Sequence, residues 1–315
     1  MHISMAPIQG ITDFRFRNVF NQHFKGVDFY YAPYIRMDKG LIIPKARQKD
    51  VDPKNNEGLN LIPQVMSNDV DELLFLSQYL SDLGYTEMNW NLGCPYPMVT
   101  KRKLGAGMIP EPDMVNSLLG RIMPELKLKM SVKLRMGLFD YSEIDNLIPV
   151  LNQYPLKEII LHPRIGKDLY KNLADKNGFE RVRSKFTSPL AYNGDINSKD
   201  DFQNLIQRFP EVNHVMLGRG LIANPFLSEE IIGTEIDADE KVQRFRKFHD
   251  LLLAEVSGAL SGHSHIITRM RSYWEYFAQS FADPHKVFKL VKKSTSLDKY
   301  DGAVRRIIQE NEWLT

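Results

Sequence analysis

Polar side chains recur in pairs two residues apart, each pair at the end of an apolar run. Lys133 and Arg135 lie in SVKLRMG, and His162 and Arg164 lie in ILHPR. Residues at this spacing on a β-strand project from one face. Several cations on one face are costly without anions, so the pairs favour a phosphorylated ligand. The alternative is that one member of each pair faces a helix and forms a structural ion pair.

Cys94 follows a third pair, Asn89 and Asn91 in NWNLGCP, and begins a polar loop that runs to Gly107. A lone cysteine is usually a small buried hydrophobe. Beside a loop of lysine, arginine and glycine, however, a thiol can reach a ligand and donate or lose a proton. A nucleophilic pairing of Cys94 with His162 stays open. Because there is one cysteine and the histidines are scattered, we predict no metal site.

Two glycine-containing tetrapeptides follow later apolar runs, YNGD at 192–195 and LGRG at 217–220. Glycine lets backbone N–H groups approach a phosphate closely, and Arg219 would add a charge. Each tetrapeptide alone is a weak signal because turns often contain Asn-Gly. Together they predict a phosphate site late in the chain.

Length and composition limit the class of protein. The 315 residues suit one barrel of roughly 250 residues plus a small appendage. The net charge of +2 is too small for nucleic-acid binding by overall charge, so any RNA contact must use local patches. No run approaches the ~18 apolar residues of a membrane span, and the N-terminus shows no export signal. We therefore expect a cytoplasmic protein without membrane contact.

Eight short apolar runs alternate with amphipathic stretches over the first ~235 residues, a rhythm typical of β/α units. For example, 69–83 is predicted to be a helix with Asp69 as N-cap and Gly84 beyond its end. The predicted strands are 2–8, 27–33, 61–66, 87–92, 130–136, 158–163, 189–194 and 214–218. Such strands form either a closed barrel or an open doubly wound sheet. Polar residues at the ends of many strands favour the (β/α)₈ TIM barrel.

After about Asp237 only helical patterns remain, and they predict a C-terminal all-helical domain. We therefore divide the chain into a barrel domain, 1–235, and a helical domain, 236–315. The predicted helices of the tail are 238–260, 264–281, 284–293 and 298–312.

The tail carries cations that suit a polynucleotide. Lys286, Lys289 and Lys293 share one helix face with Lys292 at its edge, and two arginines lie among aromatic residues. Cations among aromatics can hold phosphates and stack on bases. The alternative is a solvated lysine face with the aromatics in a core. The residues of the second group are Arg269, Arg271, Tyr273, Trp274 and Tyr276.

In order, these segments resemble the tRNA-dihydrouridine synthase family over nearly the whole chain. The matching segments are MAPIQGITD, PQVM, NWNLGCP, SVKLRMG, LHPR, YNGD and LGRG. The resemblance implies that Cys94 is the catalytic acid and that Asn91 lies beside the target base. It implies an FMN site formed by Pro7, Ile8, Gln9, Gln64, Lys133, His162, Asn193, Gly194, Asp195, Gly218 and Arg219. Further predicted substrate contacts are Lys101, Arg102, Arg135, Arg164, Arg269 and Arg271.

The activity implied by this resemblance is reduction of a D-loop uridine of tRNA to 5,6-dihydrouridine, with FMN as cofactor and NADPH as reductant. We infer no obligate protein partner. The chain departs from the family pattern at Ile8, Asn89, Pro163, Ile165 and Asp168. Asn89, for example, stands where aspartate is usual. The alternatives are a TIM-barrel FMN oxidoreductase acting on a small molecule, or a non-catalytic RNA-binding protein.

Overall fold

A computed structural model describes residues 1–37 and 40–310. The chain divides into two compact units. The first contains Met1–Gln9, Asp28–Asp195 and Pro210–Met216. The second contains Gly10–Val27, Ile196–Phe209 and Leu217–Thr315. Each unit is described by itself.

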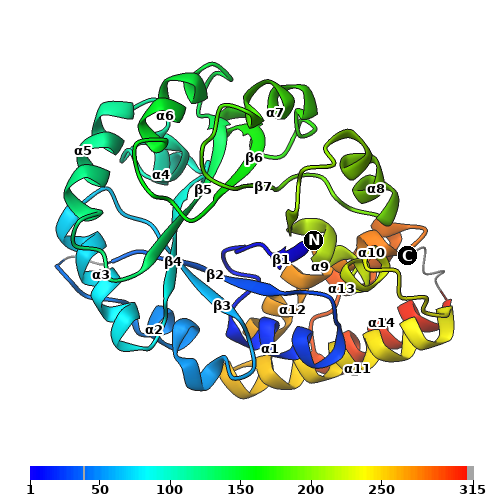
Figure 1. Ribbon diagram of the computed structural model, residues 1–315. Helices are drawn as coiled ribbons and strands as arrows, with labels where there is room; N and C mark the ends of the chain where they lie inside the picture. Colours follow the sequence, from blue (N-terminus) through cyan, green and yellow to red (C-terminus); the bar gives the residue numbers. More distant parts are fainter. Residues whose placement is uncertain (38–39, 311–315) are drawn as a thin grey trace. The chain divides into compact units, whose positions relative to one another are not determined.

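Eight parallel strands close into a barrel in the order β1 to β8, which confirms the predicted fold (Figure 1). Each strand begins within two residues of its predicted start. Strand β1 is shorter than predicted because its ladder with β2 pairs only Ser4 and Met5. The strands are β1 (His2–Met5), β2 (Phe29–Ile35), β3 (Leu61–Val65), β4 (Glu87–Leu92), β5 (Lys129–Gly137), β6 (Ile159–Ile165), β7 (Leu190–Tyr192) and β8 (His214–Leu217).

Apolar side chains from five strands and from the residue after β1 fill the inside of the barrel. The cluster consists of Ala6, Tyr31, Ile62, Ile160, Ala191 and Met216. Because side chains alternate along a strand, residues two and four further on face the same interior toward its C-terminal end. Gln64, His162 and Asn193 each stand two residues after a member of this cluster. These polar side chains therefore lie nearer the C-terminal end of the barrel than the apolar cluster does.

The four longer helices of the first unit bury an apolar face. In Figure 1, α3, α5, α6 and α7 form an arc outside the strands. Asp69 caps α3 by accepting from the Glu72 N–H, and Gly84 follows with φ of 90°, as predicted. The helices are α2 (Lys45–Val51), α3 (Val70–Asp82), α4 (Pro97–Thr100), α5 (Pro112–Ile122), α6 (Glu143–Leu151) and α7 (Lys176–Arg183), with short 3₁₀ helices at Pro53–Asn55, Gly105–Met108 and Gly166–Asp168.

The second unit is helical. Its described helices are α1 (Phe14–His23), α8 (Lys199–Arg208), α9 (Arg219–Ala223), α10 (Leu227–Ile231), α11 (Ala238–Ala259), α12 (His263–Phe277), α13 (Pro284–Lys292) and α14 (Leu297–Glu310), with a 3₁₀ helix at Ala278–Ser280. The four helices predicted for the tail are present. Residues 311 and 312 of the last one lie outside the described residues. The domain boundary near residue 235 stays a prediction.

An aromatic core holds this unit together. Phe248 of α11 packs edge-on against Phe16 of α1 and Phe277 of α12. Tyr273 and Trp274 are fully buried in the same core. The prediction that these two aromatics stack on RNA bases is therefore wrong, and the alternative of a core role is confirmed for them.

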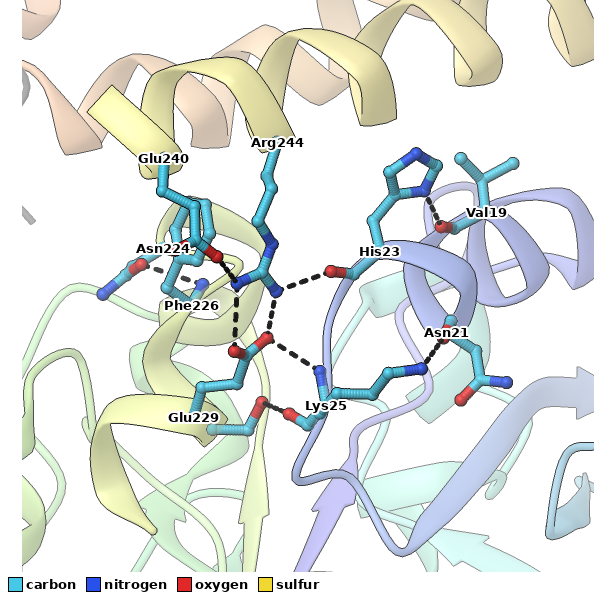
Figure 2. A network of polar contacts seen from close by, with 10 residues as sticks. Val19, Asn21, His23, Lys25, Asn224, Phe226, Glu229, Glu240 and Arg244 are labelled. Carbon is cyan, nitrogen blue, oxygen red and sulfur yellow. Dashed lines mark hydrogen bonds and ion pairs between the residues drawn. The ribbon is translucent and has the colours of Figure 1, made fainter. Parts of the chain in front are cut away.

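A polar network joins three helical segments of this unit (Figure 2). Glu229 of α10 accepts hydrogen bonds from Arg244 of α11 and from the Lys25 N–H, at 2.9 Å for the latter. Arg244 also donates to the His23 carbonyl oxygen and to Glu240. The Glu229 side chain is 5% exposed and that of Arg244 is 21% exposed. This pair is therefore largely desolvated, and each charge depends on the other.

Replacing Glu229 with alanine should lower the free energy of unfolding by about 3 kcal/mol, because it leaves the Arg244 guanidinium shielded from water without its main partner. Urea denaturation measures the change. Asp301→Ala is the matched control, since Asp301 and Arg305 form an exposed ion pair on α14. That control should cost at most about 1 kcal/mol. Equal losses in the two variants would contradict a special role for the buried pair.

Candidate active site

Strand register brings the predicted polar pairs together. Asn91 of β4 lies beside Lys133 of β5, and Arg135 of β5 lies beside His162 of β6. Gln64 of β3 lies beside Asn89 of β4. Four neighbouring strands thus supply one polar surface at the C-terminal end of the barrel, where active sites of this fold lie.

The amide of Asn91 holds the start of the cysteine loop. Its Oδ1 accepts from the Gly93 N–H at 3.0 Å and from the Cys94 N–H at 2.9 Å. Its Nδ2 donates to Gln64 Oε1 at 2.7 Å. The position of Cys94 therefore depends on a side chain that is itself fixed by the neighbouring strand.

The chain of amides continues into the barrel. Gln64 Nε2 donates to Asn89 Oδ1 at 2.7 Å, and Asn89 Nδ2 donates to Ser131 Oγ at 2.8 Å. An aspartate at 89 would place a charge in this buried interior, whereas the amide accepts at one end and donates at the other. Asparagine at position 89 therefore keeps the hydrogen-bond network uncharged. Each amide in it accepts from one neighbour and donates to the next. Both Asn89 and Asn91 face the interior, so neither fits the helix-facing alternative.

Cys94 is buried and packs with Met66, Val99 and Leu104, with Tyr34 against the cluster. Burial raises the pKa of the thiol above its usual value. Hydrogen bonds from the Tyr96 backbone and the Tyr34 side chain oppose this rise. The result is a thiol that stays protonated at neutral pH and has donors nearby to stabilise a thiolate. Such a group can donate a proton.

Gly105 lies directly on Cys94. A Cβ at Gly105 would stand 2.7 Å from the Cys94 carbonyl oxygen and 2.8 Å from its Cβ. The Gly105 φ of 55° also favours glycine. The Ala106 N–H donates to the Cys94 carbonyl oxygen at 3.0 Å. The GAG segment therefore covers the cysteine and fixes its backbone.

Gly105→Ala should displace Cys94 and cost about 1 to 3 kcal/mol of stability from backbone strain alone. Since Cys94 is the chain's single cysteine, a coloured thiol reagent reports on it alone. We expect slow labelling of the buried thiol in the wild type and faster labelling in the variant. Gly258→Ala is the control, because a Cβ there meets nothing within 4 Å. Equal labelling rates in all three proteins would show that Gly105 does not fix Cys94.

Lys133 and Arg135 differ in their surroundings. Burial, and then the charge of Arg135, lower the pKa of Lys133 to about 7. The Arg135 guanidinium donates to the carbonyl oxygens of Gly93, Ile165 and Leu169. Arg135 thus ties together the loops that follow β4 and β6. Its predicted contact with substrate stays a prediction.

His162 belongs to a second polar chain. Arg164 Nη1 lies 3.0 Å from His162 Nε2, and Arg164 also pairs with Asp195. A guanidinium can only donate, so Nε2 must accept and the imidazole hydrogen lies on Nδ1. The Asp195 carboxylate accepts from the Ala174 N–H at 2.7 Å as well. Arg164 and Asp195 therefore orient His162 with its hydrogen on Nδ1. The Asp195 carboxylate is negative and would repel a phosphate, so only the backbone N–H of Asp195 could bind one.

The predicted phosphate residues lie in different units. Asn193 is buried and donates to the Met216 carbonyl oxygen at 2.7 Å. A Cβ at Gly194 would stand 2.9 Å from the Ala174 Cβ, so this turn is tightly packed. Gly218 and Arg219 belong to the second unit, where Gly218 precedes α9. Their joint phosphate site stays a prediction.

The residues after β1 remain close to solvent. Pro7 and Ile8 are half-buried and Gln9 is exposed. The Gln9 amide oxygen accepts a hydrogen bond from the Arg47 guanidinium. Their predicted flavin contacts are untested.

Some of the cations predicted to bind RNA are exposed, and others form contacts within the protein. Lys101 and Arg102 are exposed in the turn after α4. Arg269 pairs with Asp13 at 2.8 Å, and Arg271 donates to the Ser294 carbonyl oxygen. The four lysines of α13 and its C-cap are all exposed, and within the described chain none forms an ion pair; they are Lys286, Lys289, Lys292 and Lys293.

Sequence reasoning missed Tyr34, Arg36 and Arg47. Tyr34 and Arg36 show the same spacing of two at the end of β2 that identified the other pairs. Arg47 lies on α2, where an arginine carries no positional signal. Among residues 1–37 and 40–310, no group of three potential metal ligands occurs, and no helix there is long and apolar enough to cross a membrane.

Comparison with known proteins identifies the family. The sequence profile "Dihydrouridine synthase (Dus)" matches residues 4–308. A tRNA-dihydrouridine(16) synthase of Neisseria meningitidis serogroup B is 24% identical, covering 98% of this chain and 94% of the relative. A tRNA-dihydrouridine(16) synthase of Aquipseudomonas alcaligenes is 24% identical, covering 80% and 82% respectively.

A tRNA-dihydrouridine synthase B of Pasteurella multocida is 23% identical over 71% of this chain and 67% of its own length. Among solved structures, morphinone reductase aligns with a TM-score of 0.49 and 12% identity, covering 76% of this chain and 88% of that one. The family profile spans every segment on which the resemblance was based, and this confirms the predicted family and its enzyme class. The chain belongs to the dihydrouridine synthase family.

Proposed function

We propose that this protein reduces a uridine of tRNA to 5,6-dihydrouridine and that Cys94 donates the proton to C5 of the uracil. The observation that carries the proposal is the buried Cys94 thiol, whose raised pKa keeps it protonated at the rim of the barrel. A thiol in this state suits a general acid better than a nucleophile, which requires a depressed pKa. This favours the acid role over the Cys-His pairing.

We propose FMN as the cofactor. The donor set fits the acceptor-rich edge of an isoalloxazine ring, since Lys133 and the Nδ1–H of His162 both donate. Gln64, Asn193 and Gly194 would complete the site in the barrel, and Gly218 with Arg219 would hold the phosphate. When bound, FMN would supply the hydride that C6 of the uracil receives. NADPH is the proposed reductant.

Residues around Cys94 complete the proton transfer. Loss of the proton to C5 leaves a thiolate, and this anion is favoured by the Tyr34 hydrogen bond and by the charges of Arg135 and Arg36. Asn91 holds the backbone of Cys94 through two N–H groups. The chain thus provides both the proton and the groups that stabilise the Cys94 thiolate left after its transfer.

The tRNA would be held by exposed cations on both units. Lys101 and Arg102 follow α4, and the exposed lysines of α13 belong to the second unit. An enzyme acting on a folded tRNA must take the target base out of the stack, which requires phosphate contacts beyond the site. We propose a D-loop uridine as the target, and position 16, which several relatives' names give, is the first to test. The cytoplasm is the proposed place of action.

Nucleoside mass spectrometry of tRNA from a deletion strain, mapped by position, tests this function. Loss of dihydrouridine at one D-loop position, restored by the wild-type gene, is the expected result. Unchanged dihydrouridine at every position, together with no activity of the pure protein on unmodified tRNA, would overturn it. In that case a barrel FMN oxidoreductase for small molecules, or a non-catalytic RNA-binding protein, would be the better description.

A further inference from the structure

A cavity of about 550 Å³ in the first unit has a strongly basic wall. Three of its lining residues are arginines, and among its described lining residues none carries a carboxylate. The lining consists of Tyr34, Arg36, Met37, Pro44, Ala46, Arg47 and Arg102. Cavities of 300 to 1,000 Å³ are the usual size of small-ligand sites. Met37, Pro44 and Ala46 make part of the lining apolar, and the arginines make the cavity positively charged.

No carboxylate among residues 1–37 and 40–310 pairs with the three arginines, Arg36, Arg47 and Arg102. Like charges that converge on one cavity repel each other unless an anion joins them. Arginine also presents a planar fork that matches phosphate oxygens.

Two neighbours contact two of these arginines, Arg47 through its side chain and Arg102 through its backbone. The Gln9 amide oxygen accepts from the Arg47 guanidinium. Asn68 Nδ2 donates to the carbonyl oxygens of Arg102 at 3.0 Å and Lys103 at 3.1 Å, which holds the turn that carries Arg102. Side chains outside the cavity therefore hold the Arg47 guanidinium and the turn that carries Arg102.

The cavity adjoins the cysteine. Tyr34 lines the cavity and also hydrogen-bonds to Cys94, and the charge of Arg36 acts on both side chains. One side chain thus separates the reacting thiol from the basic wall. A nucleotide carries its phosphate one ribose away from its base, so a base that reaches Cys94 brings phosphates into this neighbourhood.

We propose that this cavity binds a backbone phosphate of the RNA substrate at, or next to, the target nucleotide. The proposal rests on the proposed function and names a specific subsite for it. The contact fixes the sugar-phosphate chain while the base is turned toward Cys94, which is the positioning role that phosphate contacts serve in nucleic-acid recognition. The other nucleotide that could bring a phosphate is the nicotinamide dinucleotide, and the experiment separates the two sources.

The test compares Arg47→Ala, Arg102→Ala and their double variant with the wild type, using an unmodified tRNA transcript. Each single change should raise the KM for tRNA roughly tenfold, as expected for a charge-assisted phosphate contact. Each should also reduce the slope of log affinity against log salt by up to about one unit. Lys49→Ala is the matched control, because Lys49 is exposed on the same helix as Arg47 but does not line the cavity. Arg47→Lys, which keeps the charge, should restore most of the salt slope.

A double variant with the tRNA affinity and salt slope of the wild type would overturn the proposal, as would an equal effect of Lys49→Ala. A rise in the KM for NADPH without a change in tRNA affinity would assign the cavity to the reductant and overturn the RNA assignment. Flavin content of each variant checks folding. If the wild type forms dihydrouridine and the double variant has the same tRNA affinity and salt slope, only the proposed phosphate subsite is wrong. If the wild type forms none, the proposed function itself fails.

Discussion

Replacing Cys94 with alanine should slow dihydrouridine formation by about 10²- to 10⁴-fold, the usual contribution of a positioned general acid. Hydride addition at C6 leaves negative charge on the uracil ring that a proton at C5 must neutralise. Alanine removes the proton without adding bulk or charge. In the wild type the raised pKa of the thiol keeps that proton available at neutral pH.

The measurement is single-turnover oxidation of chemically reduced enzyme by unmodified tRNA, comparing the wild type with Cys94→Ala. Flavin content and tRNA affinity of the variant establish that it is folded and binds substrate. Gly258→Ala, at an open position on α11, serves as a control for substitution itself. A Cys94→Ala enzyme that reduces tRNA at the wild-type rate would make Cys94 a structural residue. His162, which lies beside Arg135 on the neighbouring strand, would then be the next candidate for the acid.

The barrel was predictable because its strands carry two independent signals. Apolar runs gave their positions, and polar residues at alternate positions gave their C-terminal ends, as for Lys133 with Arg135 and Asn89 with Asn91. The strand register then placed these pairs side by side. What the pattern could not distinguish is a side chain that meets a ligand from one that fixes a loop. Arg135 is the example, because its donors go to three backbone oxygens of neighbouring loops.

The helical tail shows again that a sequence pattern cannot tell a ligand contact from a structural contact. Arg269, Tyr273 and Trp274 lie close together in the sequence, as RNA-binding cations and aromatics often do, yet the two aromatics are buried and Arg269 pairs with Asp13. Helical spacing alone does not tell which face meets a core. The lysines of α13 could be placed correctly at the surface, because Val287 and Val291 mark its opposite, buried face.

The arginine cavity was beyond sequence reasoning for a geometric reason. Arg36 ends a strand, Arg47 lies on a short helix and Arg102 lies in a turn more than fifty residues later. Only the closed barrel brings these three segments together, and no local pattern records a convergence of that kind. The partners that fix the cavity, Gln9 and Asn68, come from two further loops.

Flavin affinity should weaken as the pH rises above 7, by roughly tenfold per pH unit, until the pH passes the pKa that Lys133 has in the complex. In the flavin-free protein, burial and Arg135 lower the pKa of Lys133 to about 7. The ammonium is therefore the main form below pH 7 and is lost above it. An anionic or acceptor-rich ligand favours the charged form, so binding raises this pKa and takes up a proton between the two values.

Isothermal titration of the flavin-free protein with FMN at pH 8, in two buffers with different ionisation enthalpies, measures that proton directly. We expect an uptake close to one proton per FMN bound, because Lys133 is mostly neutral before binding at this pH and charged afterwards. Lys133→Met should bind FMN more weakly, and its affinity should lose this pH dependence. Lys129→Met is the matched control, since Lys129 begins the same strand but is exposed, and it should retain the uptake. If Lys133→Met takes up the same proton as the wild type, another group titrates and Lys133 does not meet the flavin as an ammonium.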